Sequence, residues 1–395
     1  MKRLRKIGLL LTPMVFLSLQ LCIEPFDTSY VEFESALVID ATITDESKHQ
    51  EIHISRTYEF EADGPTGESG AEVQVLAGNG NTYDFTEGQP GTYLSNQIFS
   101  ADPNLEYTLA ITTKDGRNYV STAVQMMGKS SLDSLYAIRT ENDFGEDGMG
   151  IFVDGSSSGN GPGYYRYEYE ETYKVVAPDF VDVDIILVEQ PAPLQPIPEY
   201  APRSGDEFIC YPTDYSTSLI LNDTKDLNVD RYKRFNARFI SSENFIISYR
   251  YSILVRQYSQ SETAYRFYET LSNFATSESL FSETQPGFLA GNIVSQQDRN
   301  EKVLGYFDVA SVDEKRIFFN YDEYYPEENL PPYVDPCRWI APLDYFSLVE
   351  ANLVKYVKDY NDENFFRPGP FIFVPRVCGD CTALGPSEAP EFWIE

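Results

Sequence analysis

A repeated pattern of short alternating segments between residues 36 and 121 is what most limits the fold of this chain. Along Glu51–Thr57, for example, Ile52 and Ile54 lie on one face and polar side chains on the other. Turn residues such as Asp115-Gly116 separate these segments. About seven short strands at this close spacing are typical of a β-sandwich. The sequence therefore predicts an immunoglobulin-like or transthyretin-like β-sandwich over residues 35–128.

Residues 132–395 are expected to form a larger β-rich domain, so the whole chain is predicted to be mainly β. Tyr165, Tyr167 and Tyr169 alternate with Arg166 and Glu168, which is the spacing of a strand with one buried face. Five prolines in residues 190–204 predict a long irregular loop. Further strands are expected at residues 218–221, 234–240, 245–255, 303–307 and 316–319.

One or two helices are expected in this larger domain, the clearer one near residues 260–275. Ser259 and Glu262 have the spacing of a capping box, with Ser259 as the N-cap. Helical spacing then predicts one buried face, made of Ala264, Tyr268, Leu271 and Ala275. A charge at Leu271 is accordingly expected to unfold the domain. Ser347–Lys358 is a candidate for the second helix.

The composition is that of a folded and strongly acidic protein. Hydrophobic residues make up 42% of the 395 residues and aromatic residues 14%, which excludes a disordered chain. The net charge is −32. A surface of this charge repels nucleic acid, so no nucleic-acid partner is expected. With 62 acidic residues, a carboxylate pair that could bind a cation is expected by chance alone.

The first 22 residues have the order of a bacterial lipoprotein signal. Four basic residues within residues 2–6 precede an uncharged stretch, Ile7–Leu21, which ends at Cys22. That stretch is shorter than the roughly 20 apolar residues of a membrane span, and it contains Pro13. A plain secretory signal would end in small residues, whereas Leu19-Gln20-Leu21 precede Cys22. We therefore expect a signal peptide at 1–21, lipid on Cys22 and a tether over 22–34.

Four cysteines remain after Cys22. An even number of cysteines in an exported protein is typical of disulfides. The candidates Cys210, Cys337, Cys378 and Cys381 allow three pairings, and the sequence does not choose among them. A redox role for Cys378-Gly379-Asp380-Cys381 would need a helix start, which the following residues do not provide. A four-cysteine zinc site usually has two such pairs, so no metal site is predicted.

Other possible catalytic or metal-binding motifs have simpler explanations. Gly155–Gly159 matches the spacing G-x-S-x-G, but that motif needs a strand before it, a helix after it and a histidine. A Gly/Ser-rich loop surrounds it here. The two histidines of the chain, His49 and His53, belong to the other domain and are expected on the surface. The sequence thus predicts no catalytic residue and no cofactor.

Several segments in a fixed order resemble one family, the Bacteroidota lipoproteins called domain of unknown function 4249. In the first half of the chain they are Cys22–Phe26, Leu37–Thr44 with Ile54–Thr57, Gly91–Tyr93 and Asp115-Gly116 before Tyr119. In the second half they are Ser259 with Ala264-Tyr265, Pro286, Gly291–Ile293, Leu304–Phe307, Cys378–Cys381 and Pro390–Trp393. Leu21, where a small residue is usual, is the main departure. The resemblance implies an outer-membrane lipoprotein, often encoded beside a TonB-dependent receptor, and no established activity.

Three functions follow as hypotheses. The first is a binding lipoprotein, anchored in the membrane by its lipid, that assists a TonB-dependent receptor in uptake of an unknown ligand. Glu24 and Asp27 follow the cysteine closely, which by resemblance is compatible with a surface-facing rather than periplasmic protein. The second is a surface glycan hydrolase with a carboxylate pair. The third is a purely structural envelope protein.

Overall fold

The structure, a computed structural model, is mainly β, as the sequence predicts. It describes residues 35–58, 64–157, 163–191, 194–227, 231–276, 289–360 and 369–395. The predicted signal peptide, Cys22 and the tether lie outside these residues. Within the described part of the chain, no helix is both long and apolar enough to cross a membrane.

The N-terminal unit is built from short strands whose side chains alternate between core and solvent. In β1 (Leu37–Thr44), for example, Leu37, Ile39 and Ala41 are buried and the residues between them are more exposed. Antiparallel pairing connects the strands in the order β1-β2-β6-β5-β4-β7-β8. Their bounds are β2 (Glu51–Arg56), β3 (Thr66–Gly67), β4 (Glu72–Ala77), β5 (Thr82–Glu87), β6 (Thr92–Ser95), β7 (Glu106–Thr112), β8 (Asn118–Ser121) and β9 (Val124–Gln125).

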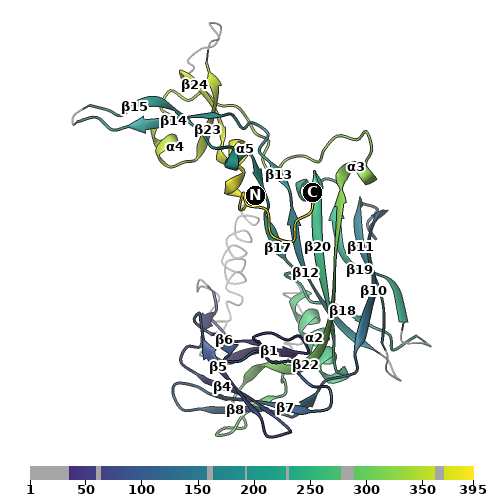
Figure 1. Cartoon of the computed structure of the whole chain (residues 1–395). Coiled ribbons are helices and arrows are strands. Elements are labelled where there is room, and N and C mark those ends of the chain that lie inside the picture. Colours follow the sequence, from purple (N-terminus) through teal and green to yellow (C-terminus); the bar gives the residue numbers. More distant parts are fainter. Residues whose placement is uncertain are drawn as a thin grey trace, which may run out of the picture.

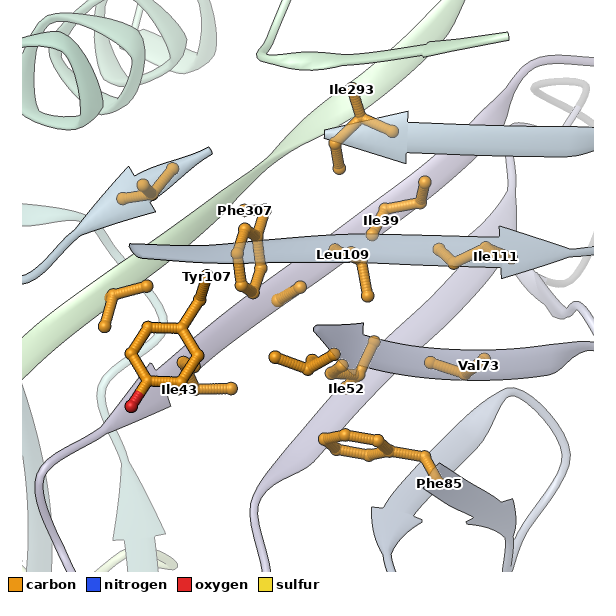
Figure 2. Packing of buried hydrophobic residues seen from close by; sticks show 14 of the residues in the cluster. Ile39, Ile43, Ile52, Val73, Phe85, Tyr107, Leu109, Ile111, Ile293 and Phe307 are labelled. Atoms are coloured by element: carbon orange, nitrogen blue, oxygen red, sulfur yellow. The ribbon is translucent and has the colours of Figure 1, made fainter. Parts of the chain in front are cut away.

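Two strands from far along the chain complete this unit. β21 (Ile293–Ser295) pairs with β8, and the first half of β22 (Val303–Asn320) pairs in parallel with β1. Figure 2 shows Ile293 and Phe307 in the same core as Leu109 and Ile111. The N-terminal unit is therefore not made of residues 35–128 alone, and the predicted boundary between two continuous domains at residues 128–132 does not describe the structure. Local alternation cannot reveal strand partners that lie about 170 and about 270 residues apart in the sequence.

β22 connects the N-terminal unit to the rest of the molecule. Val303–Ala310 pairs with β1, whereas Ser311–Asn320 pairs with β20 (Arg250–Ser259). The two strands expected at 303–307 and 316–319 are thus one strand of 18 residues. At Gly305 the backbone has φ +119°, and a Cβ atom there would lie 1.8 Å from the Ile39 carbonyl oxygen. Glycine is required at this close approach.

The second unit is a sandwich of two layers. One layer contains β12 (Tyr164–Tyr173), β17 (Thr213–Tyr215), β18 (Ile220–Asp223), β20 and the second half of β22. The other contains β10 (Ser130–Glu141), β11 (Asp147–Ser157) and β19 (Arg231–Ser241). Tyr165 and Tyr167 of the first layer pack against Met149 and Ile151 of the second in one buried cluster. The tyrosine alternation expected for residues 165–169 therefore builds this core.

A small head lies at the opposite end of the molecule from the N-terminal unit (Figure 1). Two hairpins and a short helix form it: β14 (Val183–Val188) with β15 (Ile197–Pro202), β23 (Val354–Asp359) with β24 (Phe371–Pro375), and α4 (Phe346–Glu350). Its aromatic core includes Tyr345, Tyr356 and Phe373. Short elements lie between the head and the second sandwich: β13 (Val175–Val176), η1 (Gly205–Glu207), β16 (Ile209–Cys210), α5 (Arg376–Gly379) and η3 (Cys381–Ala383). Within the second sandwich, η2 (Phe245–Ile247) joins β19 to β20 and α3 (Tyr321–Tyr324) follows β22.

Some local predictions are wrong in the head and around it. The loop expected at 190–204 contains β15, because Pro198 and Pro202 lie on a strand that pairs on one side alone. The helix expected at 347–358 is α4 followed by β23. Phe245–Ile247 is a 3-10 turn rather than the start of a strand. Of the Gly/Ser-rich loop expected at 155–161, Gly155 and Ser156 belong to β11, and residues 158–162 lie outside the described residues.

Candidate functional site

The main candidate site is an apolar cavity where helix α2 (Glu262–Thr276) meets the sheet of β1 and β22. Figure 1 shows α2 beside these strands at the junction of the two large units. The cavity, which we call the α2 cavity, has a volume of about 500 Å³. Its lining residues are Val38, Ile39, Asp40, Arg166, Leu219, Phe267, Tyr268, Leu271, Phe274, Leu289, Leu304, Gly305 and Tyr306. Both the size and the apolar lining are typical of small-molecule binding sites, as is the position between two units.

Helix α2 supplies the wall of the cavity through residues at helical spacing. Phe267 and Tyr268 are buried, whereas Leu271 is 39% exposed and Phe274 is 37% exposed. Leu271 therefore lies at the rim, and the expectation that it is buried in a core is wrong. The helical spacing correctly indicates that Ala264 and Tyr268 are buried, but Tyr268 and Leu271 also line a cavity, and the side chain of Ala275 lies outside the described residues.

The helix begins two residues later than the predicted capping box requires. Ser261 is the N-cap, because its Oγ accepts a hydrogen bond of 3.1 Å from the Ala264 N–H. Ser259 is instead the last residue of β20. Glu262, predicted to be the reciprocal cap, instead pairs with Arg266 at 2.7 Å on the exposed side of the helix. The start of α2 is thus fixed independently of the cavity residues.

Arg166 places a buried charge in the wall of the cavity. It is 9% exposed, and its guanidinium lies against the rings of Tyr258 and Tyr268, at 4.5 Å and 5.1 Å from their centroids. It pairs with Glu168, whose other carboxylate oxygen accepts a hydrogen bond of 2.8 Å from the Tyr258 hydroxyl. Nε of Arg166 has no hydrogen-bond acceptor among the described residues. A buried donor in this state costs free energy, which makes Arg166 the most unusual residue of the site.

A second cavity of about 310 Å³, whose lining is more polar than that of the α2 cavity and which we call the polar cavity, shares Arg166 and Leu219 with it. Its lining includes Glu168 and Glu170, the carboxylate pair that a glycan hydrolase would need here. Each carboxylate is already held by an arginine: Glu168 by Arg166, and Glu170 by Arg316 at 2.7 Å. Such pairing favours a structural role for both carboxylates over that of a general acid.

A buried acid, Asp308, lies on β22 next to the cavity wall. It is fully buried, and Gln260 donates a hydrogen bond of 3.3 Å to its Oδ2. Burial raises the pKa of Asp308 to about 6, although the Val309 N–H, Arg166 and Gln260 act in the opposite direction. The carboxyl is therefore largely ionised at pH 7, at a cost in stability.

We expect Asp308→Asn to stabilise the protein at pH 7 but not at pH 3.5. Between pH 3.8 and about 6 the folded state holds a proton that the unfolded chain releases, so stability falls as the pH rises through this window. The difference between these two pKa values corresponds to about 3 kcal/mol above pH 6. Urea denaturation of the wild type and of Asp308→Asn across this pH range measures the difference between their free energies of unfolding. The contributions of the other acidic residues cancel in this difference. Parallel curves would show that Asp308 does not carry this effect.

The four cysteines outside the predicted signal form two disulfides. Cys210 pairs with Cys381, and Cys337 pairs with Cys378. These bonds settle the pairing that the sequence left open. Asp335 lies close enough to Cys337 and Cys378 to form a three-ligand cluster, but both of these cysteines are used in a disulfide. The Cys210–Cys381 bond ties the C-terminal segment to the core of the second sandwich, whereas the Cys337–Cys378 bond ties residue 337 to α5. Helix α5 lies far from α2 in the fold (Figure 1).

The two histidines make local contacts in the N-terminal unit. Nδ1 of His49 lies 2.7 Å from the Ser95 carbonyl oxygen, and Nε2 of His53 lies 2.8 Å from Glu51. His53 is on the exposed face of β2, as its place in the alternation predicts. Neither histidine lines the α2 cavity.

Comparison with known proteins identifies the family. A family described as "Domain of unknown function (DUF4249)" matches residues 23–316, about three quarters of the chain. The chain belongs to this family. The resemblance inferred from its motifs is thus confirmed, and all residues that line the α2 cavity fall inside the matched region.

Other comparisons with this DUF4249 protein are uninformative about activity. No curated protein matches it. Among solved structures, a DUF4785 family protein from Legionella pneumophila matches at 8% identity with a TM-score of 0.18. The match covers 56% of this chain and 51% of that chain, so about half of each. A likeness at this TM-score supports no argument about fold or function.

Several residues of the family motifs hold β21 and β22 together within the N-terminal unit. The Asn292 side chain pairs with the Phe307 backbone: its Oδ1 accepts from the Phe307 N–H at 2.8 Å, and its Nδ2 donates to the Phe307 carbonyl at 2.9 Å. A Cβ atom at Gly291 would lie 1.6 Å from the Gly305 carbonyl oxygen. These residues therefore form a backbone joint between β21 and β22, beside the cavity.

Arg166 is the site residue that the sequence did not indicate. Its place opposite the buried tyrosines of β12 predicts a solvated side chain. Helix α2 covers that face of the strand and buries the charge instead. The sequence feature that could have indicated Arg166 is the predicted apolar face of the helix, because such a face has to pack over another surface of the protein.

Proposed function

We propose that the mature protein is a lipid-anchored outer-membrane binding protein that takes up a small, largely apolar ligand in the α2 cavity. The observation that carries this proposal is the cavity itself, about 500 Å³ of mostly apolar wall with a rim of exposed Leu271 and Phe274. We further propose that the protein assists a TonB-dependent receptor, as the family resemblance implies, and that it faces the cell surface.

The proposed anchor would keep the cavity near the membrane. Fourteen residues lie between Cys22 and Leu37, the first residue of β1. Fully extended, such a tether spans roughly 50 Å. Val38, Ile39 and Asp40, which directly follow Leu37, belong to the cavity wall. A ligand held there would stay within reach of a membrane partner.

The anchor and the partner are tested in cells. Cys22→Ser is expected to lose palmitate labelling and to miss its membrane, and a wild-type protein without label would contradict the anchor. A TonB-dependent receptor is expected to co-purify from detergent-solubilised outer membranes, and repeated recovery without one would contradict the partnership. Added protease is expected to remove the protein from intact cells; removal in lysed cells alone would place it in the periplasm.

Cavity binding is tested with Leu271→Asp. Because Leu271 lies at the rim, we expect this variant to fold normally, with stability within about 0.5 kcal/mol of wild type. The neutral apolar fluorophore 1-N-phenylnaphthylamine should bind the wild type at one site, and the variant about ten-fold or more weakly, since a carboxylate now lines an apolar wall. Fluorescence titration measures both affinities.

The matched control is Leu353→Asp, which places the same charge on an exposed leucine of the head, outside the α2 cavity. It should leave the affinity for the fluorophore unchanged. Equal affinities of all three proteins would show that the fluorophore does not use the α2 cavity. If Leu271→Asp unfolds instead, Leu271 is a core residue and the cavity is closed.

A further inference from the structure

We propose that the ligand of the α2 cavity is a carboxylate amphiphile, with its apolar chain in the cavity and its carboxylate on the guanidinium of Arg166. This inference rests on the proposed binding function and goes beyond it by naming the chemical class of the ligand. It starts from the shared wall: Arg166 lines both the apolar cavity and the polar one. A ligand with an apolar part and a polar end matches that arrangement.

The hydrogen bonds of Arg166 show what its environment lacks. A guanidinium has five N–H donors and no acceptor. Glu168 accepts one of them, while Nε has no acceptor among the described residues. The rings of Tyr258 and Tyr268 stabilise the positive charge, but they do not replace hydrogen-bond acceptors in the guanidinium plane. A buried cation in this state can therefore gain from an acceptor that enters with the ligand.

The exposure of the charges around Arg166 favours an anionic acceptor over a cationic group. Three carboxylates act on this residue: Glu168, which is 42% exposed in its side chain, Asp40, which is exposed, and Asp308, which is fully buried and accepts a hydrogen bond from Gln260. Glu168 and Asp40 keep contact with water and Asp308 lines neither cavity, whereas the guanidinium has lost almost all contact with water and lines both. Carboxylates bind arginine through paired, charge-assisted hydrogen bonds, so a carboxylate satisfies the guanidinium better than a hydroxyl does.

The remaining wall determines the rest of the ligand. Phe267, Leu271, Phe274, Leu289 and Leu304 offer no charge, and the hydroxyl of Tyr306 is already bonded to Thr263 at 2.9 Å. The body of the ligand should accordingly be hydrocarbon. Each methylene removed from a chain buried here is expected to weaken binding roughly three- to four-fold.

The test compares three amphiphiles with the same chain: dodecanoate, 1-dodecanol and dodecyltrimethylammonium, each below its micelle concentration. They displace 1-N-phenylnaphthylamine from the full-length chain carrying Cys22→Ser, so that no detergent competes. We expect dodecanoate to bind at least about ten-fold more tightly than either of the others, and octanoate to bind more weakly than dodecanoate. This preference is measured without altering the cavity, so it does not depend on any variant folding.

Arg166→Gln should abolish the preference for dodecanoate, while Arg166→Lys should keep part of it. Arg266→Gln is the matched control, because Arg266 lies on the exposed side of α2 and lines neither cavity, and it should leave the preference unchanged. Equal binding of the three amphiphiles would overturn the carboxylate inference and leave the binding function standing. If dodecyltrimethylammonium bound most tightly, the carboxylate inference would be wrong, and Asp40 rather than Arg166 would bind the charged end of the ligand. If neither the fluorophore nor any amphiphile binds, the proposed binding function itself fails.

Discussion

Phe307→Ala is expected to lower the free energy of unfolding by about 3–5 kcal/mol and to do so through the N-terminal unit. Phe307 is fully buried, and it packs with Ile39 and Leu109 although it lies about 200 residues beyond Leu109 in the sequence (Figure 2). The cavity left by the missing ring would lie in that core. Urea denaturation measures the loss. Hydrogen exchange of the amides of β4 and β7 shows where it acts, and their protection should fall.

Phe319→Ala provides the comparison on the same strand. Phe319 lies 12 residues further along β22 and is 2% exposed in the core of the second sandwich. Its removal should cost a similar free energy but lower the protection of β11 and β19 more than that of β4 and β7. If Phe307→Ala left the exchange of β4 and β7 unchanged, residues 35–128 would form a core on their own, as the sequence pattern alone suggests.

The contrast between β4 and β22 shows how far sequence patterns reach in this protein. β4 alternates buried and exposed residues along its whole length, so its position and its buried face can be predicted from six residues. From Tyr306 to Ala310, by contrast, β22 is buried at every residue, because it passes through the junction of two units. An unbroken buried run has no alternation to read. Nor does any local pattern name β1 as its partner.

The candidate site illustrates the same limit. Helical spacing predicts α2 and its apolar face, but the spacing is the same whether that face packs on protein or lines a cavity. Leu271 belongs to the cavity because no described side chain opposite it fills the space. Arg166 is part of the site because helix α2 covers it. The residues next to Arg166 in the sequence do not reveal that contact. The chemistry of this site thus depends on tertiary placement.

The family motifs that can be checked in the structure support the fold rather than a reaction. Asn292, Gly291 and Gly305 hold β21 and β22 together through backbone contacts. Cys378 and Cys381 each close a disulfide. These motif residues therefore explain how β21 and β22 are held in the N-terminal unit next to the cavity, and the identity of the ligand has to be argued from the cavity wall.

Removal of the Cys210–Cys381 disulfide is expected to have the largest effect on stability. This bond closes a loop of 171 residues, and the chain-entropy model gives about 5 kcal/mol for a loop of that length. The Cys337–Cys378 bond closes 41 residues, for which the model gives about 4 kcal/mol. Both cysteines of the longer loop are fully buried, so the double variant Cys210→Ser/Cys381→Ser also introduces polar groups into the core.

Urea denaturation of both double serine variants, with and without reductant, separates these contributions. The variant lacking Cys210–Cys381 should be the less stable one, and reductant should destabilise the wild type more than either variant. Native protein should not react with a thiol reagent until it is reduced, and it should contain no zinc. Free thiols in the native protein would contradict the disulfides, and stoichiometric zinc would mean that Asp335, Cys337 and Cys378 hold a metal instead of a disulfide. In that case the metal, rather than the covalent bond, would hold Cys337 against α5.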